Sequence, residues 1–272
     1  MNMQGTLRKM TTKLSEVVEY ALPVGEQSLA LNPLIGQHLE LEFLGQIYCK
    51  NCDRKINKSY SQGFCYPCMK SLAACDMCIL KPEQCHFHQG TCREPEWGQQ
   101  NCMVDHIVYL ANTSALKVGI TRKSQIPTRW IDQGATEALP IYRVKTRHIS
   151  GLVEVELAKH MADRTNWRAM LKGDSASIPL QEKASDAVLQ IEETIKSLLL
   201  DHGDDAVQPL EANVTTIHYP VNQYPNKIKS FNFDKEPLVS GTLMGIKGQY
   251  LIFDTGVINI RKFAGYSVAV RA

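Results

Sequence analysis

Apolar and polar residues alternate from position 39 to 43 in the segment 39–44, Leu-Glu-Leu-Glu-Phe-Leu, which is the period of a half-buried strand. The apolar run at 17–22 has a composition that also suits a strand. A further apolar pair at 47–48 leads directly into the first cysteine of the chain. We therefore expect β-structure in residues 1–48, with one strand entering a cysteine-rich turn.

The middle of the chain predicts a β-hairpin followed by a helix, a strand and a second helix. The corresponding periodic segments fall, in order, at 106–111, 116–121, 129–133, 139–144 and 150–161. We expect Thr128 and Ser150 to cap the two helices. Val153, Leu157 and Met161 recur at helical spacing, so they should form the buried face of the second helix. The predicted order is ββαβα.

Beyond this unit the pattern predicts a linker at 175–179, one more helix and a return to strands. The helix is expected at 187–200, with its apolar face at Val188, Ile191, Ile195 and Leu198. The segment 213–272 contains short apolar runs separated by glycine turns, a pattern typical of a small barrel or a strongly bent sheet.

These patterns predict an α+β protein whose two chain ends pair in one small barrel-like β-domain. The expected units are an N-terminal β segment at 1–48, a zinc-binding module at 49–104, an α/β domain at 105–200 and a C-terminal β domain at 213–272. With 272 residues, 44% of them hydrophobic, the chain is long enough for about two globular domains with insertions.

All nine cysteines lie between Cys49 and Cys102. The first four occur as two pairs, each with two intervening residues, which is the spacing of a four-cysteine zinc site: Cys49, Cys52, Cys65 and Cys68. A tight turn of this kind presents two thiolates to one ion at about 2.3 Å, and two such turns complete a tetrahedron. The spacing therefore predicts a structural zinc ion.

The second half of the cysteine block repeats the theme less regularly. The second set of ligands that we expect is Cys75, Cys78, Cys85 and Cys92. Three further residues compete for these places, namely His86, His88 and Cys102. Ligands of the two sites can also interleave. We expect two structural zinc ions in total.

Disulfides and an iron–sulfur cluster are the alternatives to zinc. Disulfides need an oxidising compartment, but the start of the chain has no apolar run of signal-peptide length. No stretch approaches the ~20 apolar residues of a membrane span, so we expect a cytoplasmic protein with no membrane partner. Four cysteines also suit an iron–sulfur cluster, and spacing alone does not exclude iron.

Charge is nearly balanced over the whole chain, at +2, which argues against a globally basic nucleic-acid-binding protein. Between positions 117 and 147, however, seven basic residues face two acidic ones, a local charge of +5. The residues that we expect to contact nucleic acid there are Arg122, Lys123, Arg143, Lys145 and Arg147. Near the other end of the chain, Lys247, Arg261 and Lys262 can add contacts. An ordinary basic surface is the alternative.

The ββαβα segment resembles the GIY-YIG nuclease superfamily from His106 to Trp167. The family's first motif, a strand ending in tyrosine, matches at Tyr109, and its second, a strand reaching glycine, matches at Gly119. Lys117 stands where the second signature tyrosine would be. The chain also departs from the pattern at the first glycine and at a histidine after the family arginine, where it has Ile107 and Gln133.

The resemblance implies four catalytic residues: Tyr109, Lys117, Arg129 and Glu154. Tyr109 would orient or deprotonate water, Arg129 would stabilise charge on the phosphate, and Glu154 would hold Mg²⁺ mostly through waters. Lys117 would contact phosphate or lower the pKa of a nearby tyrosine. Glu156 is an alternative alignment for the glutamate. Structural roles compete: Tyr109 as a core residue, and Glu154 as a helix-start carboxylate that the helix dipole favours.

The whole chain also resembles a bacterial family of unknown function that has a cysteine-rich block followed by the strings VYLA, KVGITR and RWIDQGA. We expect a zinc-containing protein that binds DNA or RNA, with metal-dependent phosphodiester hydrolysis as its possible activity. A non-catalytic module that binds nucleic acid or a ribonucleoprotein, and a structural zinc protein that binds a protein partner, are the alternatives.

Overall fold

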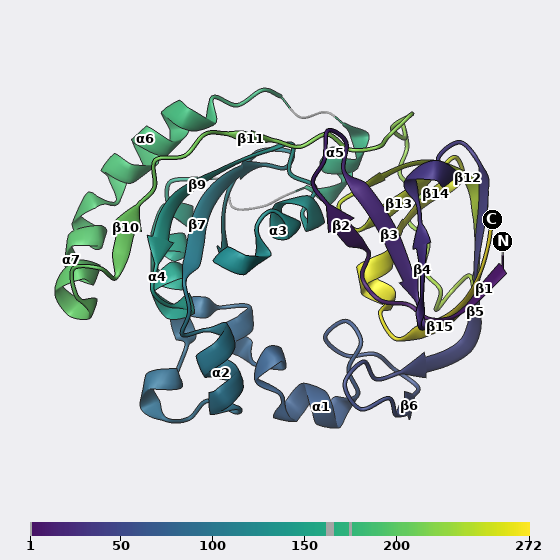
Figure 1. Cartoon of the computed structure of the whole chain (residues 1–272), viewed down its shortest axis with the longest axis horizontal. Coiled ribbons are helices and arrows are strands. Elements are labelled where there is room, and N and C mark those ends of the chain that lie inside the picture. Colours follow the sequence, from purple (N-terminus) through teal and green to yellow (C-terminus); the bar gives the residue numbers. More distant parts are fainter. Residues whose placement is uncertain (1, 162–165, 174–175) are drawn as a thin grey trace.

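The computed structural model of the protein describes residues 2–161, 166–173 and 176–272. Figure 1 shows a β-rich part that contains both chain ends and an α/β part, with the cysteine-rich segment (blue) running between them along one side. The predicted linker at 175–179 begins at Ser175, outside the described residues.

One seven-stranded antiparallel sheet joins the two ends of the chain. Its strands lie in the order β1 (Asn2–Thr6), β15 (Tyr266–Arg271), β5 (His38–Tyr48), β12 (Leu238–Lys247), β13 (Tyr250–Phe253) and β14 (Gly256–Asn259), and β6 (Lys55–Ile56) also pairs with β5. The alternation in β5 buries Leu39 and Leu41, so the strand predicted at 39–44 is confirmed. The same strand continues to Tyr48 and delivers the chain to the first cysteine.

The barrel-like domain predicted from both chain ends is an open sheet and not a closed barrel. The sheet ends at β14 on one side and at β1 on the other, and these two edges do not pair within the described residues. The edge beside β1 is instead met by a three-stranded sheet of β2 (Thr11–Lys13), β3 (Glu19–Val24) and β4 (Gln27–Ala30). Leu7 forms a bridge with Val24, and the Gly25 N–H donates to the Thr6 carbonyl at 2.9 Å. The two sheets bury their apolar faces in one core.

The second large sheet is covered by three of the described helices. Its order is β10 (Val207–Pro209), β9 (Glu137–Val144), β7 (His106–Asn112) and β8 (Leu116–Arg122), with β11 (Thr215–Thr216) also paired to β9. The helices are α3 (Thr128–Asp132), α4 (Arg147–Ala158), α5 (Trp167–Lys172), α6 (Leu180–Gln190) and α7 (Glu192–His202). Helices α4, α6 and α7 cover the sheet, whereas α3 contacts β2 and α5 packs on β13 and β14. The run β7, β8, α3, β9, α4 has the ββαβα order that the sequence predicts.

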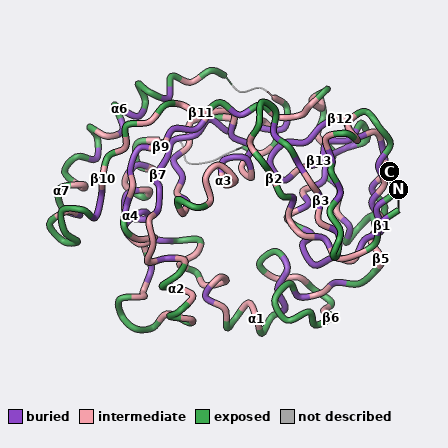
Figure 2. Tube along the Cα trace, in the orientation of Figure 1, coloured by how far each residue is buried: buried purple, intermediate pink, exposed green. Residues whose placement is uncertain are grey.

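Strand β7 is buried on both faces and connects two cores (Figure 2). Because side chains alternate along a strand, Val108 and Leu110 face the helical side, where they pack in the core that includes residues of α4. Ile107, Tyr109 and Ala111 face the opposite way and join the core of the seven-stranded sheet. The face of β7 that carries Ile107, Tyr109 and Ala111 therefore lies where the α/β part meets the β-rich part.

The cap predicted for α4 is wrong. Thr146 caps the helix, since its hydroxyl accepts the Ile149 N–H at 3.2 Å, and the helix begins earlier than expected, at Arg147. Ser150 is buried within the helix and donates its hydroxyl to the Arg147 carbonyl at 2.7 Å. Glu154 consequently lies well beyond the first turn, and the helix dipole does not account for a carboxylate there.

Two other helix predictions need correction. Thr128 is the first residue of α3 rather than its cap, and Pro127 precedes it without a side-chain hydrogen bond. The helix predicted at 187–200 is two helices, because the backbone leaves helical dihedrals at buried Ile191, between α6 and α7. No helix in the described ranges is long and apolar enough to span a bilayer.

The cysteine-rich segment consists of short elements with little apolar burial (Figure 2). It contains α1 (Tyr66–Ser71) and α2 (Pro95–Asn101), with 3₁₀ turns at Ala73–Cys75, Met77–Ile79, Pro82–Gln84 and Phe87–Gln89. Further 3₁₀ turns elsewhere lie at Asn32–Leu34, Lys123–Gln125 and Ile260–Phe263. Segments of this kind commonly depend on bound metal instead of a hydrophobic core.

Buried His106, at the start of β7, makes stability depend on pH. Its Nδ1 lies 2.7 Å from the Val104 carbonyl oxygen and its Nε2 has no partner among the described residues, and burial lowers the pKa of the imidazole from 6.5 to about 4. The unfolded chain takes up this proton below pH 6.5, whereas the folded chain resists it until about pH 4. The free energy of unfolding should therefore fall across that window, by about 3 kcal/mol in total.

Denaturant titrations of the wild type and of His106→Gln, at neutral pH and near pH 5, check this expectation. The variant should lose less stability than the wild type between the two conditions. Equal losses in the two proteins would contradict it.

Candidate metal centre and cationic cleft

Four thiols converge where β5 leaves the large sheet. The Sγ atoms of Cys49, Cys52, Cys65 and Cys68 all lie within 4.8 Å of one another. Backbone hydrogen bonds hold the first turn, since the Cys49 N–H donates to the Arg54 carbonyl and the Asp53 N–H donates to the Cys49 carbonyl, both at 2.9 Å. This cluster is positioned to hold a metal ion, and four thiolates at this spacing are compatible with zinc.

The second turn of the cluster is the start of α1. Cys65 caps this helix, because its sulfur accepts the Cys68 N–H at 3.4 Å, and the Asn51 amide donates to the Cys68 sulfur at 3.5 Å. Burial raises the pKa of Cys49, but bonds from the N–H groups of Cys65, Asn51 and Cys52 outweigh it and lower this pKa to about 6. Cys68 has a pKa raised to about 12, chiefly by its side-chain hydrogen bond with Cys65. An entering cation would displace the remaining protons.

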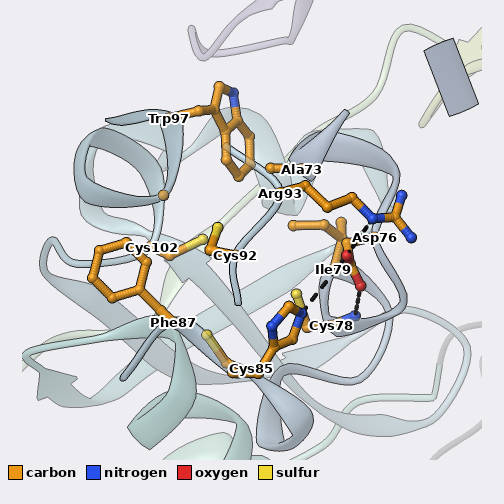
Figure 3. A pocket seen from close by; sticks show the side chains of 12 residues that line it. Ala73, Asp76, Cys78, Ile79, Cys85, Phe87, Cys92, Arg93, Trp97 and Cys102 are labelled. Atoms are coloured by element: carbon orange, nitrogen blue, oxygen red, sulfur yellow. Dashed lines mark hydrogen bonds and ion pairs between the residues drawn. The ribbon is translucent and has the colours of Figure 1, made fainter. Parts of the chain in front are cut away.

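The structure brings three of the four residues of the predicted second set, Cys78, Cys85 and Cys92, to one cavity, but not Cys75. Cys75 packs against the apolar residues beside the first cluster. The thiols that line this separate small cavity are those of Cys78, Cys85, Cys92 and Cys102 (Figure 3). Of the competing histidines, His86 lies beside Asp76, at 3.7 Å, while His88 packs near His148 with ring centroids 5.8 Å apart.

Burial affects the thiols of this second cavity. It raises the pKa of Cys78 to about 11, with further contributions from the negative charge of Asp76 and from Cys85. It also raises the pKa of Cys102 to about 11, although the nearby Arg147 guanidinium opposes the rise. Without a cation, these two thiols stay protonated at neutral pH.

A cleft of about 400 Å³ lies between the cysteine-rich segment, the α/β sheet and the β-rich part. Its charged lining residues are Lys117, Arg122, Arg129, Arg147, Arg261 and Glu154. Five cations thus face one carboxylate. They come from β8, α3, α4 and the 3₁₀ turn at Ile260–Phe263, and the turn at 79–82 of the cysteine-rich segment forms part of the wall.

Three of the four residues that the resemblance marks as catalytic line this cleft, namely Lys117, Arg129 and Glu154. The fourth, Tyr109, is fully buried behind it, and its hydroxyl donates to Gln133 Oε1, on the cleft wall, at 2.8 Å. Burial raises the pKa of Tyr109 to about 12, although the Arg129 cation opposes the rise. Tyr109 is therefore protonated at neutral pH.

Gly119 makes the position of Tyr109 possible. The two residues lie opposite each other on β7 and β8, and a Cβ on Gly119 would come within 2.7 Å of the Tyr109 hydroxyl oxygen. Only glycine leaves room for the ring at this point of the sheet. The packing also includes Trp130 of α3, whose ring centroid is 5.9 Å from that of Tyr109.

The alternative glutamate lies outside the cleft. Glu156 bonds Lys159 at 2.5 Å along the exposed side of α4, and its other oxygen is 4.0 Å from His160. This position gives Glu156 an ordinary surface role. Among the two candidates, Glu154 alone lines the cleft within the described residues.

The residues predicted to contact nucleic acid divide into two groups. Arg122 and Arg147 line the cleft. Arg143 instead pairs with Asp105 at 3.3 Å, and Lys145 pairs with Asp205, both away from the cleft lining. Lys123 is exposed in the 3₁₀ turn after β8.

Two contributors were underestimated by sequence reasoning. Arg261 reaches the cleft from the C-terminal segment, where its Nε donates to Gln62 Oε1 at 2.8 Å. Burial, and then repulsion from Arg129, lowers the pKa of Arg261. Cys102 joins the second cavity because α2 returns the chain to it. No local pattern identifies either role, because both depend on segments that are distant in the sequence.

Comparison with known proteins gives one match. No curated protein and no solved structure is significantly similar to the chain. A family model described as "Protein of unknown function (DUF2797)" matches residues 36–268, which include the four-cysteine cluster and every charged residue of the cleft. Because the match spans most of the chain, from β5 to β15, the protein belongs to this uncharacterised family.

Proposed function

We propose that the protein binds nucleic acid through the cationic cleft and hydrolyses phosphodiester bonds there in the presence of a divalent metal ion. The observation that carries the proposal is the lining of the cleft, where five cationic side chains from separate parts of the chain face a single carboxylate. A phosphate backbone is the common polyanion that suits such a surface, and its binding releases condensed counterions.

The carboxylate supports the hydrolytic part of the proposal. Glu154 lines the cleft and offers a hard oxygen ligand, so it would be the residue that holds Mg²⁺. Such an ion supplies an activated water and neutralises developing negative charge. Arg129 and Lys117, on the same wall, would bind the phosphate oxygens and stabilise the charge of the transition state.

The arrangement of Tyr109 also supports a divergent GIY-YIG-like site. Its ring crosses Gly119 on the neighbouring strand, and its hydroxyl holds Gln133. In this reading Tyr109 positions Gln133 and stays protonated, so it does not serve as the base. The proton of the attacking water would then pass to solvent or to a phosphate oxygen of the substrate.

Binding without cleavage is the second candidate. It is favoured by the burial of Tyr109 and by its raised pKa, since the residue that the resemblance assigns to water activation is neutral and removed from the cleft surface. The same cations would then hold DNA, RNA or a ribonucleoprotein without chemistry.

The test is an assay of binding and cleavage with single-stranded, duplex and branched DNA and RNA, with and without Mg²⁺. Glu154→Gln removes the metal ligand and should lower cleavage on the order of a hundredfold or more, while binding without metal is kept or strengthened. Glu156→Gln, on the same helix but outside the cleft, is the matched control and should cleave normally.

Tight binding with no cleavage in the presence of any metal would refute the hydrolase and support the non-catalytic binding function. Absence of binding to every nucleic acid would refute the proposal and favour a structural zinc protein with a protein partner. Loss of activity in Glu156→Gln equal to that in Glu154→Gln would remove Glu154 from its assigned role.

A further inference from the structure

Twelve residues line the cavity in the second half of the cysteine-rich segment, and four of them are cysteines. Figure 3 shows the side chains of Cys78, Cys85, Cys92 and Cys102 directed towards one central space. Cys85 and Cys102 are buried, and the other two are partly buried. The space holds about 10 Å³, which is room for roughly one water-sized atom.

From this arrangement we propose that Cys78, Cys85, Cys92 and Cys102 form a second metal centre, separate from the first cluster, and that zinc is its ion. The ligand set differs from the set that spacing predicts, since Cys102 takes the place of Cys75. Four thiolates are the donor set of a structural zinc site. Unlike those of the first cluster, these four sulfurs do not all lie within 4.8 Å of one another in the described structure, so they would have to move closer to the ion on binding.

Asp76 and His86 are the competing ligands, because their oxygen and nitrogen atoms lie within 4.8 Å of each other and of the Cys78 sulfur. Both have protein partners, although in His86 only Nδ1 is bonded and Nε2 remains beside Asp76, at 3.7 Å. The Arg93 Nε donates to the Asp76 carboxylate at 2.6 Å, and His86 Nδ1 shares a hydrogen bond of 2.7 Å with the Thr91 hydroxyl. These contacts suit an outer shell that orients the site.

The thiols lack such partners. Of the four sulfurs, that of Cys92 donates a hydrogen bond to the Glu94 carbonyl at 3.5 Å. The sulfurs of Cys78, Cys85 and Cys102 form no hydrogen bond within the described part of the chain. Polar or ionisable groups that are buried together usually have partners. A metal ion would satisfy all four sulfurs at once.

Charge near the cavity fits a thiolate centre. A divalent ion with four thiolates carries a net charge of −2, and a buried charge of this kind needs a counter-charge. The guanidinium of Arg147 lies close enough to Cys102 and Cys78 to interact with them electrostatically. The guanidinium also donates to the Ile79 carbonyl at 2.6 Å, and the backbone N–H of Arg147 donates to the Cys102 carbonyl at 2.8 Å.

The same contacts join the second centre to the cleft. Ile79, Pro82 and Arg147 all line the cleft, and Pro82 follows Cys78 in the segment that the ion would fix. Helix α4 packs tightly on this turn, because a Cβ on Gly151 would come within 2.4 Å of the Glu83 nitrogen. If the cleft acts as proposed above, the second ion therefore fixes one of its walls.

The experiment is a metal count by atomic emission on protein purified under reducing conditions. The wild type should hold two zinc ions, and Cys102→Ser should hold one. Cys75→Ser and His86→Ala are matched controls from the same segment, and each should keep two. A single ion in the wild type would overturn the proposal, as would loss of an ion in His86→Ala but not in Cys102→Ser.

A titration of the metal-free wild type with Co²⁺ covers the case in which Cys102→Ser fails to fold. Two equivalents should bind, both with the intense visible absorption and thiolate charge-transfer bands of tetrahedral four-sulfur coordination. A second equivalent with a spectrum of mixed nitrogen and sulfur ligands would overturn the four-thiolate assignment. Neither measurement uses nucleic acid, so the result of each is independent of whether the proposed function is correct.

Discussion

Replacing Cys65 by serine is expected to remove one zinc ion and to unfold the segment around the first cluster while the β-sheets stay folded. Structural zinc supplies about 10–16 kcal/mol of binding free energy in small zinc domains at pH 7, and serine is a poor replacement for a thiolate ligand. The local apolar core cannot compensate, because its buried members are only Cys49, Phe64 and Cys65.

Metal analysis and hydrogen exchange measure the two parts of this expectation. Amides between positions 49 and 72 should exchange much faster in Cys65→Ser, whereas those of β5 before the cluster should keep their protection, since β5 lies between β15 and β12. Cys75→Ser is the control, because Cys75 packs near the cluster without belonging to it. Equal loss of zinc in both variants, or full zinc in Cys65→Ser, would refute the assignment. If the metal analysis found iron instead of zinc, the first cluster would be assigned as an iron–sulfur site.

The double variant Lys117→Ala/Arg129→Ala should weaken nucleic-acid binding about a hundredfold or more. Both residues line the cleft, and each charged hydrogen bond to phosphate that is lost costs about 1.5–3 kcal/mol. The slope of log affinity against log salt should also become shallower by about 2, because two phosphate contacts disappear. Fluorescence anisotropy over a range of salt concentrations measures both quantities.

Arg143→Ala/Lys145→Ala is the matched control for this variant. It removes the same charge from the same basic region, but these side chains pair with Asp105 and Asp205 outside the cleft. Binding and salt slope should stay close to those of the wild type. If the control variant weakened binding as much as the cleft variant, the contact would be a diffuse basic surface and not the cleft.

Periodicity predicted the elements of this fold better than their ends. The period of two in 39–44 and the apolar runs that became β7, β8 and β9 are local properties, and the strands form where these patterns lie. The helix caps were misplaced because Thr146 and Ser150 are both good capping residues, and their sequence context does not show where the chain turns. A small barrel or a strongly bent sheet was expected from short strands and glycine turns, yet whether such a sheet closes depends on what meets the edge of β1.

The candidate sites also have features that the local sequence predicted and features that it did not. Two residues between cysteines are enough to build a metal-binding turn, so the first cluster could be identified from spacing within one short segment. The resemblance also marked Lys117, Arg129 and Glu154, which line one cleft. It could not indicate that Tyr109 lies behind that cleft, because burial follows from the packing of β7 against two cores.

Local spacing and period were thus sufficient for β5, β7, β8 and β9, for α3 and α4 apart from their ends, and for the four-cysteine cluster, since each involves neighbours along the chain. They did not predict α1, α2 or α5. The choice of Cys102 over Cys75 and the arrival of Arg261 beside Arg129 required the folded arrangement of distant segments. The physical reason is that the position of a cysteine or a cationic residue in the sequence does not show which distant residues it will lie beside in the folded protein. Which of them share a cavity is set by how α2, α4 and the turn at Ile260–Phe263 pack against one another and the sheets.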